Sequence, residues 1–127
     1  MNENTVRHVY VVDDDIPSYQ LIKEILSDHR LSVKHFLNGN DLLAIFNNGK
    51  IPDLVIMDIQ LPDTDGLELT RQIKLLQPSL PVIAYTSFAM PGDRERCIGG
   101  GCDEYISKPI DVEKFFDVAR RYLPGIF

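Results

Sequence analysis

Four short apolar segments constrain the fold of this chain more than any other feature. Each is a short apolar run, of which the fourth ends in Ser107, and each leads directly into side chains with carboxylate, hydroxyl or ammonium groups. The runs that begin at Val9, Leu54, Val82 and Tyr105 lead into Asp13-Asp14-Asp15, Asp58, Thr86-Ser87 and Lys108-Pro109. Such runs are typical of strands in a parallel sheet that helices cover on both faces. Because ligands bind beyond the carboxyl ends of these strands, we expect the polar groups to meet at one edge of the sheet.

The segments between the runs carry the signals of helices. Helices are predicted to begin near 17–18, 39–41, 65 and 91–93 and at the cap Asp111, and a more polar strand is predicted over 31–37. This alternation predicts an α/β fold, a doubly wound parallel sheet of five strands and five helices, whose strand order periodicity leaves open. The apolar positions expected on the inner faces of the first, third and fifth helices are Leu21, Ile22, Ile25, Leu26; Leu69, Ile73, Leu76; and Val112, Phe115, Phe116, Ala119, Tyr122, Leu123.

Size and charge exclude several classes of protein. With 127 residues, the chain is the size of one domain with one core. The net charge is −6 and the basic residues are dispersed, so direct binding of nucleic acid is not expected. No apolar run is long enough for a membrane span and the N-terminus lacks a signal peptide, so we expect a cytoplasmic protein, or the cytoplasmic part of a larger one, without membrane contact. Cys97 and Cys102 match no zinc or redox spacing and are predicted to be reduced packing residues.

Taken together and in this order, the strand-end motifs resemble the receiver domain of bacterial two-component response regulators. The similarity rests on Val12-Asp13-Asp14, on Met57-Asp58-Ile59-Gln60-Leu61-Pro62 followed by Asp65-Gly66, on Thr86-Ser87 and on Ser107-Lys108-Pro109. It extends over essentially the whole chain and implies a single receiver domain over 1–127 with a core of about 8–123. It also implies the flavodoxin-like strand order 2-1-3-4-5.

The resemblance implies that Asp58 accepts a phosphoryl group. The donor would be the phosphohistidine of a sensor histidine kinase or of a histidine phosphotransfer protein. Carboxylates of Asp13, Asp14 and Asp58 about 4 Å apart would repel one another by roughly 4 kcal/mol at an effective dielectric constant near 20. A divalent cation relieves such repulsion, and Mg²⁺ prefers oxygen ligands of this kind. The family precedent adds the backbone carbonyl of Gln60 to the expected metal ligands.

Further residues take roles that the resemblance implies. Lys108 and the hydroxyl of Thr86 would bind the phosphoryl group, and the small Ser87 would leave room for it. Pro109 is similar to the cis-proline of the family, which would aim Lys108 into the site. Tyr105 matches the switch aromatic of many receivers. Phosphorylation would then shift the face formed by the predicted fourth helix, fifth strand and fifth helix between two states.

The resemblance also bears on turnover and context. Gln60 and Phe88 occupy the two positions that tune hydrolysis of the acyl phosphate in the family. The resemblance to a phosphoacceptor also implies no enzymatic activity beyond self-phosphorylation and self-dephosphorylation. The stretch 89–105 is most similar to receivers of hybrid histidine kinases. We therefore expect either a single-domain regulator or a receiver that belongs to a longer protein. A weak homodimer is also consistent with the resemblance.

Each motif taken alone has a simpler interpretation. Acidic residues before helices often only cap them, and Asp15, Asp63 and Asp65 are interpreted as cap or loop residues and Gly66 as a turn residue. The three histidines, His8, His29 and His35, lie away from the motifs in the sequence and are predicted to have no role. Two other functions stay open: a haloacid-dehalogenase-like phosphatase, which also uses an aspartate after a first strand, and a binding module that does not depend on phosphorylation.

Overall fold

The computed structural model describes residues 6–27, 30–87 and 90–126 and contains one five-stranded parallel sheet. Strands and helices alternate along the chain as β1 (Arg7–Val12), α1 (Ile16–Leu26), β2 (Leu31–Phe36), α2 (Gly39–Asn47), β3 (Leu54–Met57), α3 (Gly66–Leu76), β4 (Val82–Thr86), α4 (Asp93–Gly99), β5 (Glu104–Ser107) and α5 (Val112–Tyr122). The strand order is β2-β1-β3-β4-β5 and all neighbouring pairs are parallel. The predicted doubly wound fold and the strand order that the resemblance implied are confirmed.

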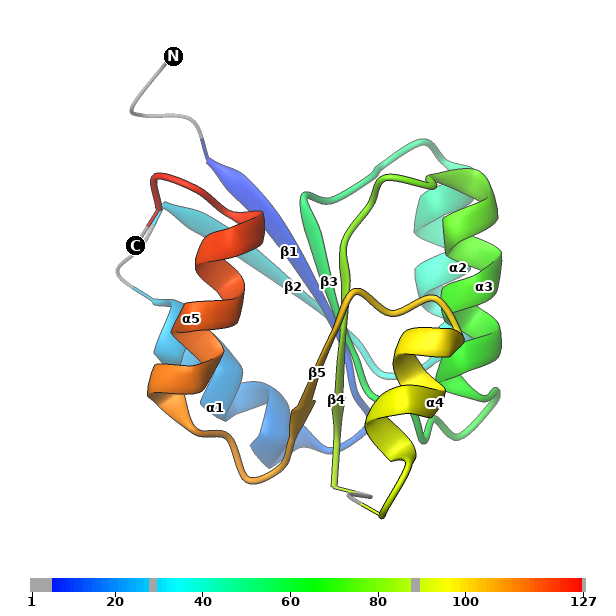
Figure 1. The fold of residues 1–127 in the computed structure, drawn as a ribbon. Coiled ribbons are helices and arrows are strands. Elements are labelled where there is room, and N and C mark those ends of the chain that lie inside the picture. The colour runs from blue at the N-terminus through cyan, green and yellow to red at the C-terminus, as the bar shows by residue number, and fades with distance from the viewer. Residues whose placement is uncertain (1–5, 28–29, 88–89, 127) are drawn as a thin grey trace.

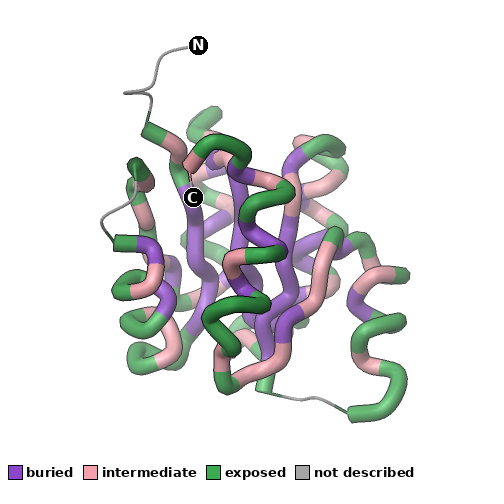
Figure 2. Tube along the Cα trace, turned by 60° about the vertical axis from the view of Figure 1, so that its left-hand side comes forward, coloured by how far each residue is buried: buried purple, intermediate pink, exposed green. Residues whose placement is uncertain are grey.

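Helices cover the sheet on both faces. Helices α1 and α5 lie on one face and α2, α3 and α4 on the other (Figure 1). Side chains alternate between these layers, so that Val9 and Val11 pack toward α1 and α5, while Tyr10 and Val12 pack toward the other three helices. The central strands are buried along most of their length (Figure 2). This double coverage explains why their sequences are unbroken apolar runs.

Four of the helices begin at a side chain that accepts a hydrogen bond from the first turn. The cap residues are Asp15, Asn38, Asp65 and Asp111, in agreement with the predicted caps Asp15, Asp65 and Asp111. Helix α4 differs, because its N-cap is Gly92 in the left-handed region with φ 88° and no side chain caps it. This helix has the weakest start of the five.

Three apolar residues predicted to be inside lie at the surface. The side chains of Leu21, Leu76 and Val112 are 40%, 51% and 44% exposed. The buried stripe is narrower than the full apolar pattern, since α1, α3 and α5 each bury a pair spaced by four residues: Ile22 with Leu26, Leu69 with Ile73, and Phe115 with Ala119. Leu76 and Val112 are also terminal residues of their helices, where the chain leaves the sheet.

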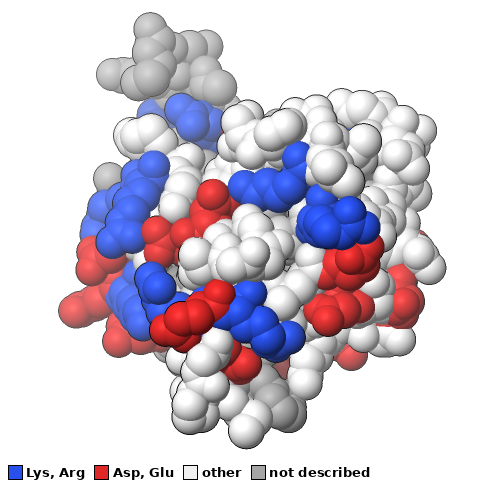
Figure 3. All heavy atoms as spheres, turned by 45° about the vertical axis from the view of Figure 1, so that its right-hand side comes forward, with Lys and Arg blue, Asp and Glu red and all other residues white. Residues whose placement is uncertain are grey.

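Charged residues of both signs share the surface. On the face that Figure 3 shows, basic and acidic side chains lie next to one another. The ion pairs include Arg71–Glu68 at 2.6 Å and Arg120–Asp117 at 2.7 Å, both exposed, so each contributes little to stability. Within the described residues, no helix combines the length and the apolar character that crossing a bilayer requires. Cys97 and Cys102 are buried and unpaired, as predicted for packing residues.

Candidate functional site

The sheet register brings the predicted strand-end residues to one edge. Val12 pairs with Met57, Met57 pairs with Ala84 and Thr86 pairs with Ser107, so β1 and β3 end level with each other, and β4 and β5 end together two residues further along the sheet. The backbone continues this ladder beyond the strands through hydrogen bonds from Asp58 N to Val12 O at 2.9 Å and from Lys108 N to Thr86 O at 2.8 Å. Side chains from four separate parts of the sequence therefore share one site.

Three carboxylates form the acidic part of this site. One oxygen from each of Asp13, Asp14 and Asp58 lies within 4.8 Å of the others. Asp13 and Asp58 are buried, with exposed fractions of 1% and 7%, whereas Asp14 is exposed. Burial raises the pKa of Asp58 to about 6, and the neighbouring Asp13 carboxylate acts in the same direction. The cluster is thus short of positive charge, which is the condition in which oxygen ligands attract a divalent cation.

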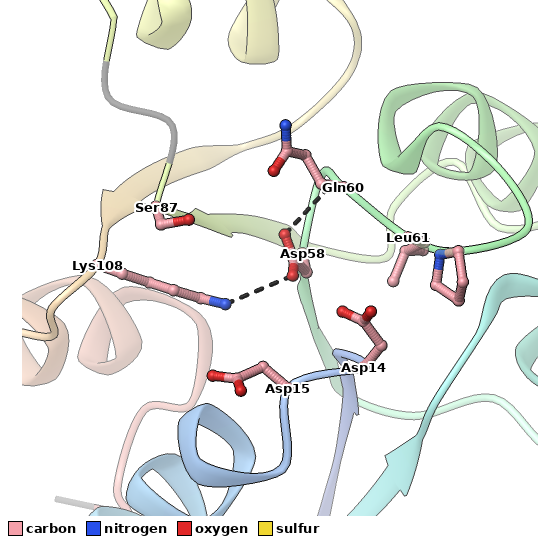
Figure 4. Close-up of a pocket in the computed structure, with 8 residues that line it drawn as sticks. Asp14, Asp15, Asp58, Gln60, Leu61, Ser87 and Lys108 are labelled. Atoms are coloured by element: carbon pink, nitrogen blue, oxygen red, sulfur yellow. Dashed lines mark hydrogen bonds and ion pairs between the residues drawn. The ribbon is translucent and has the colours of Figure 1, made fainter.

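Lys108 supplies the nearest positive charge. Its Nζ lies 2.9 Å from Asp13 Oδ2 and 3.4 Å from Asp58 Oδ2 (the contact with Asp58 is drawn in Figure 4). Burial opposes its charged form, but the hydrogen bond to Asp13 and the charge of Asp58 outweigh burial and raise the pKa of Lys108. The expected pairing with Asp58 is present, yet the shorter contact is with Asp13. The ammonium therefore bridges the two buried carboxylates.

The loop after β3 holds Asp58 from the other side. The backbone N–H of Gln60 donates to Asp58 Oδ1 at 3.0 Å, and Gly66 N donates to Ile59 O at 2.7 Å. A Cβ on Gly66 would lie 2.4 Å from Asp58 O and 2.6 Å from Ile59 Cα. The interpretation of Gly66 as a turn residue is therefore wrong: it is the first residue of α3, and the close approach of the Asp58 backbone requires a glycine there.

The site opens into a cavity of about 410 Å³. Its lining residues are Asp14, Asp15, Asp58, Gln60, Leu61, Pro62, Ser87 and Lys108, most of them labelled in Figure 4. Thr86 is buried at the end of β4, and Ser87 is exposed beside it. Tyr105 is half-buried on β5, and the Lys108–Pro109 peptide bond is cis. Phe88, like His29, lies outside the described residues.

Asp63 proved to be a cap, but not of the helix that follows it. Its two carboxylate oxygens accept hydrogen bonds from the backbone N–H groups of Gly39 and Asn40, each at 2.9 Å, and these bonds lower the pKa of Asp63. The residue thus ties the loop after β3 to the start of α2. No local pattern in the sequence signals this contact, because 24 and 23 residues separate the partners.

His35 was predicted to have no role, but the structure places it in contact with the site. Its Nε2 lies 2.7 Å from the backbone oxygen of Asp13, and its ring stacks on Tyr19 with 3.7 Å between centroids. The contact arises because β2 pairs with β1 and places His35 opposite Val11. Periodicity does not signal this contact, whereas the strand order that the resemblance implied, with β2 beside β1, is the signal that could have revealed it.

Comparison with known proteins agrees with this geometry. Residues 9–120 match the response regulator receiver domain. The chain is 39% identical over 119 residues to the polar-differentiation response regulator DivK of Brucella anthropi, which covers 92% of this chain and 96% of DivK.

Solved structures give the same picture. The BeF3-activated receiver domain of DrrB, a Thermotoga maritima protein, has a TM-score of 0.84 at 31% identity and covers 94% of this chain and 98% of its own. A CheY-like receiver domain protein from Methanospirillum hungatei has a TM-score of 0.83 at 26% identity, with 92% and 93% covered. Sequence and structure therefore agree that this chain belongs to the response regulator receiver domains, the signalling phosphoacceptors of two-component systems.

Proposed function

We propose that Asp58 is the residue of this receiver that becomes phosphorylated, with a phosphohistidine of a sensor kinase or phosphotransfer protein as the donor. A carboxylate oxygen would attack the phosphorus and form an acyl phosphate. The P–N bond to the imidazole would break, and its electron pair would return to the ring nitrogen, which takes up a proton. The observation that carries this proposal is the position of Asp58 between Lys108 and the Gln60 N–H, in an open cavity at the end of β3.

The contacts of the two buried carboxylates favour Asp58 over Asp13 as the nucleophile. Asp13 Oδ1 accepts from the N–H of Asp15 at 2.9 Å, and its Oδ2 accepts from Lys108 at 2.9 Å. Asp58 Oδ2 has the longer contact with Lys108, 3.4 Å, and Asp58 lines the cavity whereas Asp13 does not. With a pKa of about 6, Asp58 is mostly deprotonated at neutral pH and is a competent nucleophile.

The donor set fits Mg²⁺. Three carboxylates have oxygens within 4.8 Å of one another, and the one ammonium group of Lys108 balances only one of their negative charges. A divalent cation would balance the other two, and the ligand atoms that the carboxylates offer are all oxygens. We infer that Asp13, Asp14, Asp58 and the backbone carbonyl of Gln60 hold the ion. When bound, Mg²⁺ supplies positive charge that neutralises the oxygens of the phosphoryl group in transfer.

The remaining residues would act on the phosphorylated state. Lys108 can exchange its contact with Asp58 for the new phosphoryl oxygens while it stays near Asp13, since its stem is flexible. The hydroxyl of Thr86 would donate a hydrogen bond to the phosphoryl group, and the small Ser87 would leave space for that group. The ring of Tyr105 would move inward when Thr86 turns toward the phosphoryl group. The signal would leave through the face formed by α4, β5 and α5. A weak homodimer stays a prediction.

The extent of the receiver unit and the hydrolysis of its acyl phosphate are part of the same proposal. We propose one receiver unit over about 8–123, with only self-phosphorylation and self-dephosphorylation chemistry. Gln60 and Phe88 would set the rate of the second reaction. A hybrid histidine kinase as parent protein stays a prediction, which the length of the reading frame would test.

Mapping the phosphorylated residue tests the proposal. The chain is incubated with a phosphorylated histidine phosphotransfer protein or a small acyl phosphate, with and without Mg²⁺, and the adduct is reduced with borohydride before peptide mapping. We expect one Mg²⁺-dependent, stoichiometric modification at Asp58 and none in Asp58→Asn, while Asp63→Asn, the matched control in the same loop, is modified normally. Label that survives Asp58→Asn would contradict the assignment, and continuous turnover of a generic phosphate ester would indicate a phosphatase.

A further inference from the structure

His35 and Tyr19 form a contact at the acidic cluster that the roles assigned above do not use. Both side chains are half-buried, and their rings are nearly parallel, with 7° between planes and 3.7 Å between centroids. The edge of the imidazole points at the backbone oxygen of Asp13, 2.7 Å from Nε2. A carbonyl oxygen only accepts hydrogen bonds, so Nε2 must carry the proton and donate.

This hydrogen bond completes the fixation of Asp13. Its N–H donates to Phe36 O at 3.0 Å, its Oδ1 accepts from Asp15 N, and its Oδ2 accepts from Lys108. The backbone oxygen is the remaining polar atom of the residue, and His35 binds it. Each polar atom of Asp13 therefore has a hydrogen-bond partner, and two of the four partners, His35 and Phe36, come from the end of β2.

The bond from His35 also controls the neighbouring residue. The peptide unit between Asp13 and Asp14 is planar, so holding its oxygen fixes the orientation of the whole unit and the direction in which the chain reaches the Cα of Asp14. Asp14 is exposed, and packing does little to place its side chain. The backbone must therefore set where its carboxylate lies within the cluster.

We propose that His35, supported by the ring of Tyr19, is a positioning residue that orients the Asp13–Asp14 peptide and thereby preorganises the carboxylates for Mg²⁺. This inference rests on the metal site of the proposed function. Outer partners that orient ligands commonly change metal affinity by about 10-fold or more when they are removed. We therefore expect His35→Leu to bind Mg²⁺ about 10-fold more weakly than the parent chain.

Isosteric substitutions separate positioning from bulk packing. The side-chain nitrogen of glutamine reaches about as far as Nε2, whereas that of asparagine reaches only about as far as Nδ1. His35→Gln should keep an affinity within about 3-fold of the parent, and His35→Asn should behave like His35→Leu. Tyr19→Leu removes the stacked ring and leaves His35 in place, so it should weaken binding less than His35→Leu. His8→Leu, at an exposed histidine of β1, is the matched control and should bind like the parent.

The experiment is a Mg²⁺ titration of each variant, followed by amide chemical shifts at one fixed pH, with dispersion of the apo spectrum as the check of folding. Weak binding by His35→Leu and His35→Asn with recovery in His35→Gln supports the proposal. Equal affinity in all folded variants, or equal loss in His35→Gln and His35→Leu, overturns it while the metal site stands. If the parent itself does not bind Mg²⁺, the proposed metal site fails and the role of His35 fails with it. Should His35→Leu not fold, the comparison of Gln with Asn and the Tyr19→Leu variant decide the outcome.

Discussion

At the scale of single residues, the site is built from groups whose requirements conflict. Asp58 is buried next to a second buried carboxylate, and its pKa is raised to about 6 because burial disfavours the charge. Asp63, in the same loop, has a lowered pKa because two backbone N–H groups bind its carboxylate. The first residue destabilises the fold when ionised and the second stabilises it. Of these two carboxylates, Asp58 is therefore the one whose ionised form lowers the stability of the fold.

The two carboxylates predict opposite pH dependences of stability. In the absence of metal, native Asp58 binds its proton more tightly than the unfolded chain does, so its contribution is favourable below pH 3.8 and is lost as the pH rises to about 6. Relative to the parent, Asp58→Asn should therefore gain stability over this range, by at most about 3 kcal/mol. Asp63→Asn should show the reverse sign, because the contribution of Asp63 is present above its unfolded pKa and is lost as the pH falls. Urea unfolding of the three proteins from about pH 2 to pH 8 measures both differences, because the contribution of Asp63 changes only below about pH 4 and that of Asp58 changes between about pH 4 and pH 6. A gain in Asp58→Asn that is the same at every pH would contradict the burial of its charge.

Gly66 predicts a coupled loss of stability and function. In Gly66→Ala the new Cβ would meet the backbone of Asp58 and Ile59 rather than a flexible side chain, so the loop or α3 must move. Overpacking of this kind typically costs about 1–3 kcal/mol, and the displacement should slow phosphorylation of Asp58. Gly99→Ala is the matched control, since nothing lies within 4 Å of its Cβ position, and it should not lower stability. Denaturation midpoints and phosphorylation rates with a small acyl phosphate check both variants. A Gly66→Ala variant that is destabilised but is phosphorylated at the normal rate would contradict the coupling between the loop and the reaction.

At the scale of elements, α4 is built more weakly than its neighbours. It has seven residues, begins at Gly92 without a side-chain cap and buries only Cys97. Helix α5 has eleven residues, a cap at Asp111 and three buried residues. Elements with few buried contacts open and shift at low cost. Since α4 lies between β4, which ends at Thr86, and β5, which carries Tyr105, it is the element that a change at the site can move most easily.

Hydrogen exchange tests this view of α4. We expect the complex with Mg²⁺ and beryllofluoride, which replaces the phosphoryl group on Asp58, to change amide exchange mainly in 90–108 relative to the apo chain. Helix α1 and strand β2 should change little beyond the residues next to the site. Changes spread over 16–36 instead would place the output surface on the opposite edge of the sheet and leave Tyr105 as a packing residue.

At the scale of the whole molecule, what could be predicted from the sequence depended on how local its cause is. Buried strands, cap residues and the polar groups at strand ends follow from short patterns, and the four strand ends share one edge in any parallel sheet of this kind. The contacts of His35 with Asp13 and of Asp63 with α2 depend on strand order and on loops that meet across the molecule, which no local pattern encodes. Leu21 shows the same limit, because the width of a buried stripe is set by what the helix packs against.

The parallel sheet is what turns scattered residues into one site. Three strand ends supply the carboxylates of Asp13 and Asp58 and the ammonium of Lys108. The ammonium lies within hydrogen-bonding distance of both carboxylates. The central claim is that this edge is a single metal-dependent phosphoacceptor site with Asp58 as its nucleophile. If the claim holds, modification at Asp58 requires bound Mg²⁺.

Fluorine NMR of the beryllofluoride complex measures this dependence most directly, because the probe bonds to a carboxylate oxygen where phosphorus would. The parent chain should show signals of bound fluoride only when Mg²⁺ is present. Asp58→Asn should show none under any condition, while Asp63→Asn should match the parent. Bound signals without Mg²⁺, or signals that persist in Asp58→Asn, would contradict the assignment of this site.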